Sequence, residues 1–250
     1  MLKSSVLIGL TFLFILVACT NGPCLQDGMV FVSEGWFLRG ENDGRRSNEP
    51  QRSIYLDAFC IQRTEVTAGD FAVFLDDDGQ LSPAGARDPS TLAESLPAVG
   101  VLWREADAYC RWAGLRLPTE AEWEKAARGV DGRRYPWGDE WNPRYANTAE
   151  GGYGGVLPVG SLPSGASPYG ALDMAGNAVE WVADHFTFDY YPAAPERNPP
   201  GPSIVLDHGL RGGSYASSAG ETTTYFRDSS HSVQPNPRVG FRCAAIEHLK

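Results

Sequence analysis

The chain has 250 residues, and its 21 Lys and Arg against 31 Asp and Glu give a formal net charge of −10 at pH 7. Nucleic acids and anionic membrane surfaces are bound by clustered Lys and Arg side chains, so this balance argues against both as partners. The length suits one large domain with a core, and the 28 Gly and 18 Pro residues predict a loop-rich fold with short helices and strands.

The N-terminus has the layout of a signal peptide. Lys3 supplies a positive charge, and residues 6–18 are apolar apart from two positions. A membrane-spanning helix needs about 20 apolar residues, and this run is shorter. We therefore predict a cleaved signal peptide over residues 1–18.

Residues 16–19 are Leu-Val-Ala-Cys, which resembles the lipobox at which bacterial signal peptidases cut before a lipid-modified cysteine. We predict that the mature chain begins at Cys19 and that residues 19–27 form a short leader. Two or three acyl chains would anchor the exported protein in the bacterial cell envelope. Thr20 follows the cysteine, which by resemblance to enterobacterial sorting rules favours the outer membrane. The alternative is an ordinary cleaved signal with a free cysteine nearby.

The first elements of the domain, which we expect over residues 28–246, are strands. Residues 28–32 and 36–40 have the pattern of a hairpin with its turn at 33–35. A polar loop follows, and residues 53–61 alternate like one further strand.

Two helices are predicted next. Residues 67–70 form a possible capping box before a helical run at 71–75. Another helix is predicted over about 103–112, which Gly114 can end in a left-handed conformation.

The clearest helix signal follows Pro118. Thr119 is predicted as the N-cap with Glu122 as its capping-box partner, and Trp123 lies on one apolar side before Gly129 ends the helix. Farther along we predict turns and short strands at 135–138 and 172–181, a Pro-rich insertion at 191–202, and strands near 211–215 and 239–243.

Several of these segments occur in a fixed order that resembles the formylglycine-generating enzyme (sulfatase-modifying factor) family. The most specific is the run Leu-Pro-Thr-Glu-Ala-Glu-Trp-Glu at 117–124. The segments that carry the resemblance are 28–30, 64–67, 115–124, 173–181, 211–215 and 240–243. They span nearly the whole mature chain. The resemblance implies an α+β, loop-rich, C-type-lectin-like domain with short helices and strands.

Active members of the family oxidise a cysteine of sulfatases to formylglycine with oxygen and a copper(I) ion held by two cysteines. Those cysteines lie in the stretch that corresponds here to the residues between Tyr215 and Gly240, where Ser217 and Thr222 occupy their places. A hydroxyl is a hard ligand that does not replace a copper(I) thiolate. The resemblance therefore predicts the scaffold without the copper chemistry, and copper is not expected as a cofactor.

The resemblance also implies a calcium ion. The family site would take a side-chain oxygen of Asp173, the carbonyls of Gly176 and Ala178, and the carboxylate of Glu180. Hard oxygen ligands in a compact turn suit calcium. The alternative is that Glu180 only accepts backbone N–H bonds within the turn.

A second family calcium site is weaker in this chain. It would use Asn147, the carbonyl of Thr148, a carboxylate near Glu150 and the carbonyl of Tyr153. The aspartate expected there corresponds to Gly151, which has no side chain to offer.

The cysteines predict disulfides, because export permits them. Setting aside Cys19, an even set of four remains, which allows three connectivities. Family members join the cysteines at the positions of Cys110 and Cys243, which implies that pair and leaves Cys24 for Cys60.

Other catalytic arrangements have less support. Ser217, His231 and Asp228 lie in one stretch, but no Gly-x-Ser-x-Gly elbow accompanies them, so a polar surface is the favoured interpretation. Asp184 and His185 are expected to be a solvated pair. The four histidines show no regular spacing for iron or zinc: His185, His208, His231 and His248.

We expect a non-catalytic binding or structural module, a pseudoenzyme held at the membrane by its lipid, with a protein, peptide or glycan ligand. C-type-lectin-like scaffolds carry variable loops that suit recognition. The rival hypotheses are an enzyme with altered chemistry in the same cleft, and an accessory factor for an exported enzyme.

Overall fold

The computed structural model describes residues 24, 26–42, 45–78, 93–203, 206–231 and 234–246. The predicted signal peptide, Cys19 and His248 lie outside these residues. Across the ranges described, no helix combines the length and the apolar character that a membrane crossing requires.

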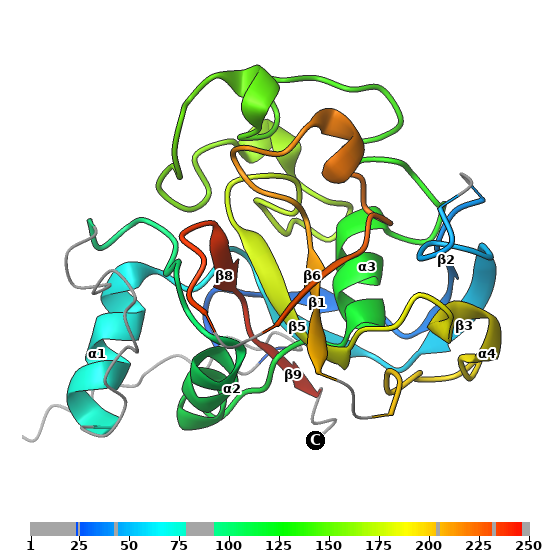
Figure 1. The fold of residues 1–250 in the computed structure, drawn as a ribbon, viewed down its shortest axis with the longest axis horizontal. Helices are drawn as coiled ribbons and strands as arrows, with labels where there is room; N and C mark the ends of the chain where they lie inside the picture. The colour runs from blue at the N-terminus through cyan, green and yellow to red at the C-terminus, as the bar shows by residue number, and fades with distance from the viewer. Residues whose placement is uncertain are drawn as a thin grey trace, which may run out of the picture.

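The fold is α+β and rich in loops, as predicted (Figure 1). The helices are α1 (Ala68–Asp78), α2 (Trp103–Trp112), α3 (Glu120–Arg128) and α4 (Tyr190–Ala193), with 3-10 turns η2 (Ala149–Gly151), η3 (Pro163–Gly165) and η4 (Ala219–Glu221). The strands are β1 (Met29–Val32), β2 (Gly35–Arg39), β3 (Arg52–Leu56), β4 (Phe59–Gln62), β5 (Val179–His185), β6 (Asp207–Arg211), β7 (Asp228–His231), β8 (Val239–Phe241) and β9 (Ala244–Ile246).

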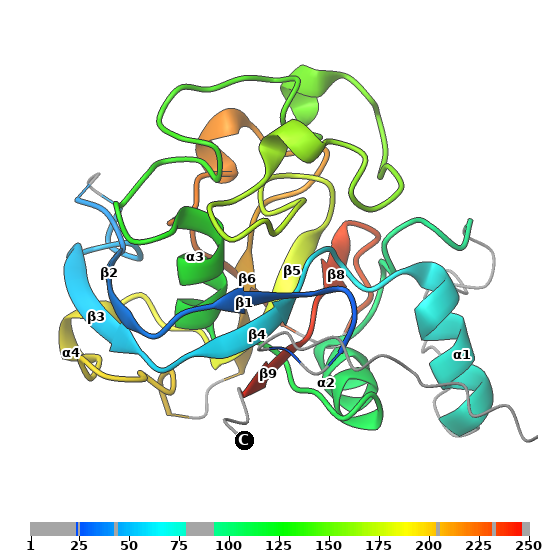
Figure 2. The same ribbon diagram turned by 180° about the vertical axis from the view of Figure 1, so that it is seen from behind.

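The strands form three small sheets. Their strand orders are β1-β4-β9, β2-β3 and β7-β6-β5-β8. The β5–β8 pair is parallel, and the other pairs are antiparallel. Helix α3 lies between the β2-β3 ribbon and the sheet that contains β5 and β6, and touches both (Figures 1 and 2). This helix therefore holds the two halves of the domain together.

The predicted caps of the helices are confirmed. Thr119 Oγ1 accepts the N–H of Glu122, whose carboxylate accepts the N–H of Thr119 in return. Thr67 Oγ1 accepts the N–H of Asp70 in the same way at the start of α1. Each bond satisfies a helix N-terminal N–H that has no partner inside the helix.

The predicted hairpin between residues 28–32 and 36–40 is wrong. β1 pairs with β4, and β2 pairs with β3, so the two strands belong to different sheets. The turn between them is directed toward α3, because the Lys125 ammonium donates to the carbonyls of Ser33 (2.7 Å) and Gly35 (3.0 Å).

Two further strand predictions need correction. Residues 53–61 are two strands, β3 and β4, and Asp57 between them donates its N–H to Asn198 Oδ1 (2.9 Å) instead of to a neighbouring strand. A strand was expected near 211–215, but β6 ends at Arg211. The chain turns there because Gly212 and Gly213 have φ angles of 89° and 68°.

The core consists of two apolar clusters, one around Trp123 and one around Trp181. The structure contains both disulfides of the implied pairing. Cys110 and Cys243 lie in the second cluster with their Cα atoms 5.6 Å apart, and Cys24 is joined to Cys60 at the β4 strand.

Candidate functional site

The two residues at the places of the copper cysteines lie side by side on Gly213. A Cβ atom added at this glycine would lie 2.7 Å from Thr222 Cγ2 and 3.2 Å from Ser217 Cβ. Both side chains therefore pack against the same backbone position. The turn that follows β6 thus brings Ser217 and Thr222 together, as the resemblance to the family implies for these two positions.

A groove of about 260 Å³ opens beside Ser217. Its apolar part consists of Val179, Leu210 and Phe226. Its polar lining comes from the loop after β6, the start of β7 and the segment before β8: Ser214, Ser217, Glu221, Asp228, Asn236 and Arg238. The surface that this groove exposes is mostly polar.

The hydroxyl groups of the groove are satisfied by local hydrogen bonds. Ser217 Oγ accepts the N–H of Ser214 (3.1 Å), and Thr222 Oγ1 donates to the carbonyl of Ala219 (3.1 Å). Ser214 Oγ lies 3.5 Å from Ser217 Oγ. These bonds shape the turn and place no general base on either hydroxyl.

The structure does not assemble Ser217, His231 and Asp228 as a triad. His231 Nδ1 contacts Asp207 Oδ1 on the neighbouring strand. Asp228 accepts the N–H of Ser229 (2.8 Å). His231 of β7 and Asp207 of β6 thus contact each other, and Ser217 does not take part in this contact.

Asp184 is buried, which corrects the expectation of a solvated pair with His185. Its Oδ2 accepts the N–H of Glu120 (2.7 Å) at the start of α3. Burial, followed by the charge of Glu120, raises the pKa of Asp184 to about 7. His185 stacks on His208 with ring centroids 4.3 Å apart, and both rings belong to the packing between β5 and β6.

The turn predicted to bind calcium contains a buried ion pair. Glu180 accepts two bonds from Arg242 (2.6 and 2.7 Å) and one from the Trp123 indole (2.8 Å). Asp173 accepts the N–H of Gly160 (2.6 Å). From the sequence, backbone N–H groups were the alternative partners expected for Glu180. In the structure its donors are the side chains of Trp123 and Arg242.

A carboxylate to which the sequence analysis assigned no role lies beside this turn. Glu65 is buried, its Oε1 accepts the Asn177 amide (2.9 Å), and its Oε2 has no hydrogen-bond partner among the described residues. Burial raises the pKa of Glu65 well above its ordinary value, and the charges of Asp173 and Glu180 raise it further. The signal available in the sequence was an acidic residue inside the family segment 64–67.

Two residues of the weaker calcium site, Asn147 and Glu150, form hydrogen bonds within the domain, while Asn147 Oδ1 is buried without a hydrogen-bond partner among the described residues. Asn147 Nδ2 donates to Asn177 Oδ1 (3.0 Å) and to the carbonyl of Gly155 (2.9 Å). Glu150 accepts the N–H of Ala219 (2.9 Å) and so supports η4. Among the residues described, no group of three or more His, Cys, Asp or Glu side chains converges on a point.

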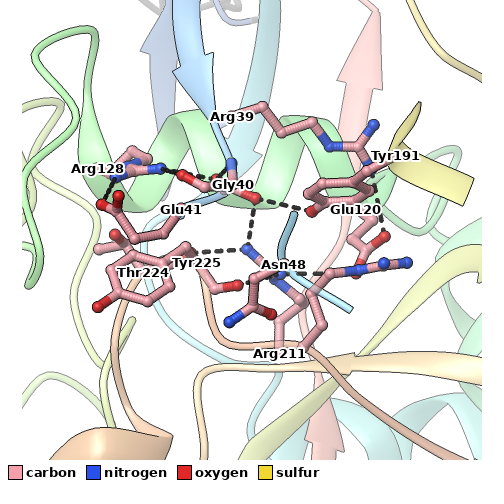
Figure 3. A network of polar contacts seen from close by, with 12 residues as sticks. Arg39, Gly40, Glu41, Asn48, Glu120, Arg128, Tyr191, Arg211, Thr224 and Tyr225 are labelled. Carbon is pink, nitrogen blue, oxygen red and sulfur yellow. Dashed lines mark hydrogen bonds and ion pairs between the residues drawn. The ribbon is translucent and has the colours of Figure 1, made fainter. Parts of the chain in front are cut away.

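A buried network of arginines and glutamates surrounds the start of α3 (Figure 3). Glu120 of α3 pairs with Arg39 (3.3 Å), Arg211 (3.5 Å) and Arg227 (2.6 Å). Burial would raise the pKa of Glu120, but the charges of Arg227, Arg211 and Arg39 lower it to about 2. The carboxylate is therefore ionised and shared by three guanidinium groups.

Glu124, one turn along α3, continues this network. It pairs with Arg211 (2.8 Å) and Arg128 (3.0 Å), and it accepts bonds from the Tyr191 hydroxyl (3.1 Å) and the N–H of Gly40 (2.7 Å). Arg128 belongs to α3 itself, whereas Gly40, Tyr191 and Arg211 come from segments far away in the sequence, so α3 connects the surrounding loops.

The network fixes both ends of the groove loop. Arg211 directly precedes the turn at residues 212–213, and Arg227 directly follows the loop that carries Ser217 and Thr222. The guanidinium groups of both arginines bond to α3. The groove is thus formed by a surface loop on a rigid frame, an arrangement that C-type-lectin-like domains use for recognition.

The chain belongs to the family of the sulfatase-modifying factor enzyme 1-like domain, whose model matches residues 19–246. It is 43% identical over 180 residues to the formylglycine-generating enzyme of Streptomyces coelicolor, covering 65% of this chain and 56% of that protein. It is 35% identical over 236 residues to the serine/threonine-protein kinase pkn1 of Chlamydia caviae, covering 86% of this chain and 37% of that protein. The chain thus spans little more than half the length of the Streptomyces coelicolor enzyme and about a third of the length of the Chlamydia caviae protein.

Among solved structures, PvdO from Pseudomonas aeruginosa is similar, with a TM-score of 0.74 and 26% identity. The match covers 87% of this chain and 94% of that one. The similarity therefore extends over most of both chains.

Proposed function

We propose that this chain is a lipid-anchored protein of the bacterial cell envelope whose formylglycine-generating-enzyme-like domain is a non-catalytic binding module. The observation that carries the proposal is the pair Ser217 and Thr222, which packs on Gly213 where active relatives require two thiolates. The groove beside this pair is the ligand site.

The donor chemistry of the groove does not fit copper(I). This ion selects soft thiolate and thioether ligands, and the groove offers hydroxyl, carboxylate, amide and guanidinium groups. The nearest cysteines in the sequence, Cys110 and Cys243, are joined to each other in a disulfide. The groove therefore offers no thiolate that could hold copper(I) for the oxidation of a substrate cysteine.

The groove suits recognition of a protein, a peptide or a glycan. Its lining is mostly polar, and Ser214 and Asn236 offer hydrogen bonds to a ligand. Glu221 and Asp228 supply negative charge and Arg238 supplies positive charge. The buried network keeps the loop in one conformation, which lowers the entropy cost of binding.

Calcium is proposed as a structural ion at the turn of residues 173–180. The supporting observation is that the Asp173 carboxylate lies near Arg242, while that guanidinium is already paired with Glu180 through two bonds. Asp173, Glu180 and the carbonyls of Gly176 and Ala178 would hold the ion. Its charge would offset the carboxylate that Arg242 leaves uncompensated.

Catalysis is tested with the mature chain, residues 19–250, in the presence of copper(I), oxygen and a cysteine-containing sulfatase peptide. We expect no aldehyde product by mass spectrometry, while the Streptomyces coelicolor enzyme converts the same peptide. The double variant Ser217→Cys/Thr222→Cys should gain copper(I) binding, measured by competition with bicinchoninate. Turnover by the unmodified chain would overturn the proposal.

A further inference from the structure

The folded domain begins close to the predicted anchor. Cys24 is tied to β4 by its disulfide with Cys60. Gln26 donates to the carbonyl of Ala113 (3.2 Å) at the end of α2. The start of the domain is therefore fastened to two elements and cannot swing away from them.

The tether between this point and the lipid is short. Five residues lead from Cys19 to Cys24. A fully extended chain covers at most about 3.6 Å per residue, so the two positions are within about 18 Å of each other. This distance is comparable to one strand length, so the surface around Cys24 lies near the membrane.

That surface is apolar. A hollow of about 290 Å³ is lined by the Cys24–Cys60 disulfide together with Met29, Leu115 and Ala244. At its rim Ile246 is 63% exposed.

The charge at the hollow is neutralised. Arg116 is the charged side chain among the described residues that line it, and it is held by Glu122 through two short bonds (2.6 and 2.7 Å). Trp112, which is 43% exposed, ends α2 just before the lining residues Gly114 and Leu115. Tryptophan is enriched at membrane–water interfaces, and aliphatic side chains are stable in contact with lipid.

The 3-10 turn η4, whose Glu221 lines the Ser217 groove, lies far from β9 in the ribbon. In both views, β9 and the nearby end of α2 are at the bottom, whereas η4 and its loop are at the top (Figures 1 and 2). The two surfaces are separated by the sheets and by α3.

We infer that the face formed by the Cys24–Cys60 disulfide, the end of α2 and β9 rests on the phospholipid bilayer, and that the Ser217 groove is thereby presented away from the membrane. This inference rests on the proposed lipid anchor. The partner is the lipid of the leaflet that holds the anchor, and the contact is apolar, in keeping with the acidic charge of the chain.

The test uses the chain of residues 19–250 coupled through the Cys19 thiol to a maleimide phospholipid, in phosphatidylcholine vesicles that contain a diazirine phospholipid. After illumination, peptides that contain residues 112–116 and 244–246 should carry at least tenfold more lipid label than peptides that contain 214–221. Even labelling of the surface, or labelling concentrated at 214–221, would overturn the inference.

A matched pair of variants checks that the contact is specific. Ile246→Asp should lower the label at residues 112–116 about fivefold, whereas Val130→Asp, at a position 58% exposed, should leave it unchanged. Equal labelling of the two variants would also contradict the inference. Fatty-acid labelling of the full chain and its Cys19→Ser variant in cells tests the anchor separately, because the maleimide lipid replaces the natural one.

Discussion

Glu65 is the residue whose environment differs most from what its chemistry favours. It is buried, one of its oxygens lacks a hydrogen-bond partner among the described residues, and two other carboxylates lie near it. A buried charge of this kind is retained only where something compensates for it. Its pKa therefore links this residue to the stability of the whole domain.

The substitution Glu65→Gln is expected to raise the melting temperature at pH 7 in the presence of EDTA. Because the folded pKa of Glu65 is raised above its ordinary value of 4.5, its contribution to stability is present below that value and is lost as the pH rises through the folded pKa. Glutamine keeps the oxygen that Asn177 binds and removes the charge. The difference in melting temperature between the variant and the wild type should be smaller at about pH 4, because the wild-type carboxyl is then mostly protonated.

Melting curves of the wild type and the variant from pH 4 to pH 8 measure this effect. Glu140→Gln, at an exposed position, is the control and should leave the pH dependence unchanged. A variant that is less stable than the wild type across the whole range would show that the carboxylate is well compensated.

Calcium should raise the melting temperature of the wild type relative to EDTA. A ligand at about 100 times its Kd adds about 2.7 kcal/mol to the free energy of unfolding. Asp173→Gly should abolish this shift, because glycine accepts the φ of 58° at this position but provides no ligand oxygen. A calcium shift of equal size in the variant, or none in the wild type, would refute the proposed site.

At the scale of elements, Gly213 is a position in the loop between β6 and β7 that leaves no room for a side chain. Gly213 has a φ of 68°, and an added Cβ would lie 2.7 Å from the carbonyl oxygen of Glu221. The groove loop folds back onto this position, so any side chain there separates Ser217 from Thr222.

Gly213→Ala is expected to lower the free energy of unfolding by about 1–3 kcal/mol, through backbone strain and the contact with Glu221. Gly220→Ala is the matched control in the same loop, because its added Cβ meets nothing within 4 Å. Denaturant unfolding of the two variants should differ accordingly. Equal effects would mean that the loop adapts without strain.

At the scale of the whole molecule, the two disulfides close loops of different length. Cys110 and Cys243 are 133 residues apart, and Cys24 and Cys60 are 36 residues apart. In the chain-entropy model these loops correspond to about 5 and about 4 kcal/mol. Both are large fractions of a net stability of about 5–15 kcal/mol.

Removing the Cys110–Cys243 bridge with Cys110→Ala/Cys243→Ala should therefore destabilise the domain at least as much as removing Cys24–Cys60 with Cys24→Ala/Cys60→Ala. Denaturant unfolding measures the difference. Non-reducing peptide mapping of the wild type provides the control, and free alkylated thiols at Cys110 and Cys243 would contradict the pairing.

Local signals were enough for several features of this protein. The caps of α1 and α3 follow from side chains within one turn of the helix, and the start and end of α2 agree with its periodicity and with Gly114. The order of the family segments, together with the substituted residues Ser217 and Thr222, is likewise visible in the sequence. These features depend on neighbours a few residues apart.

Only the tertiary structure decided which strands pair and which charges meet. β1 has the sequence pattern to pair with its neighbour β2, but it pairs with β4, and Lys125 of α3 binds the carbonyls of Ser33 and Gly35 between the two strands. The unpaired oxygen of Glu65 and the pairing of Glu120 with Arg211 and Arg227 likewise join residues from distant parts of the chain. Such contacts depend on how the chain closes over long distances, which no local pattern specifies.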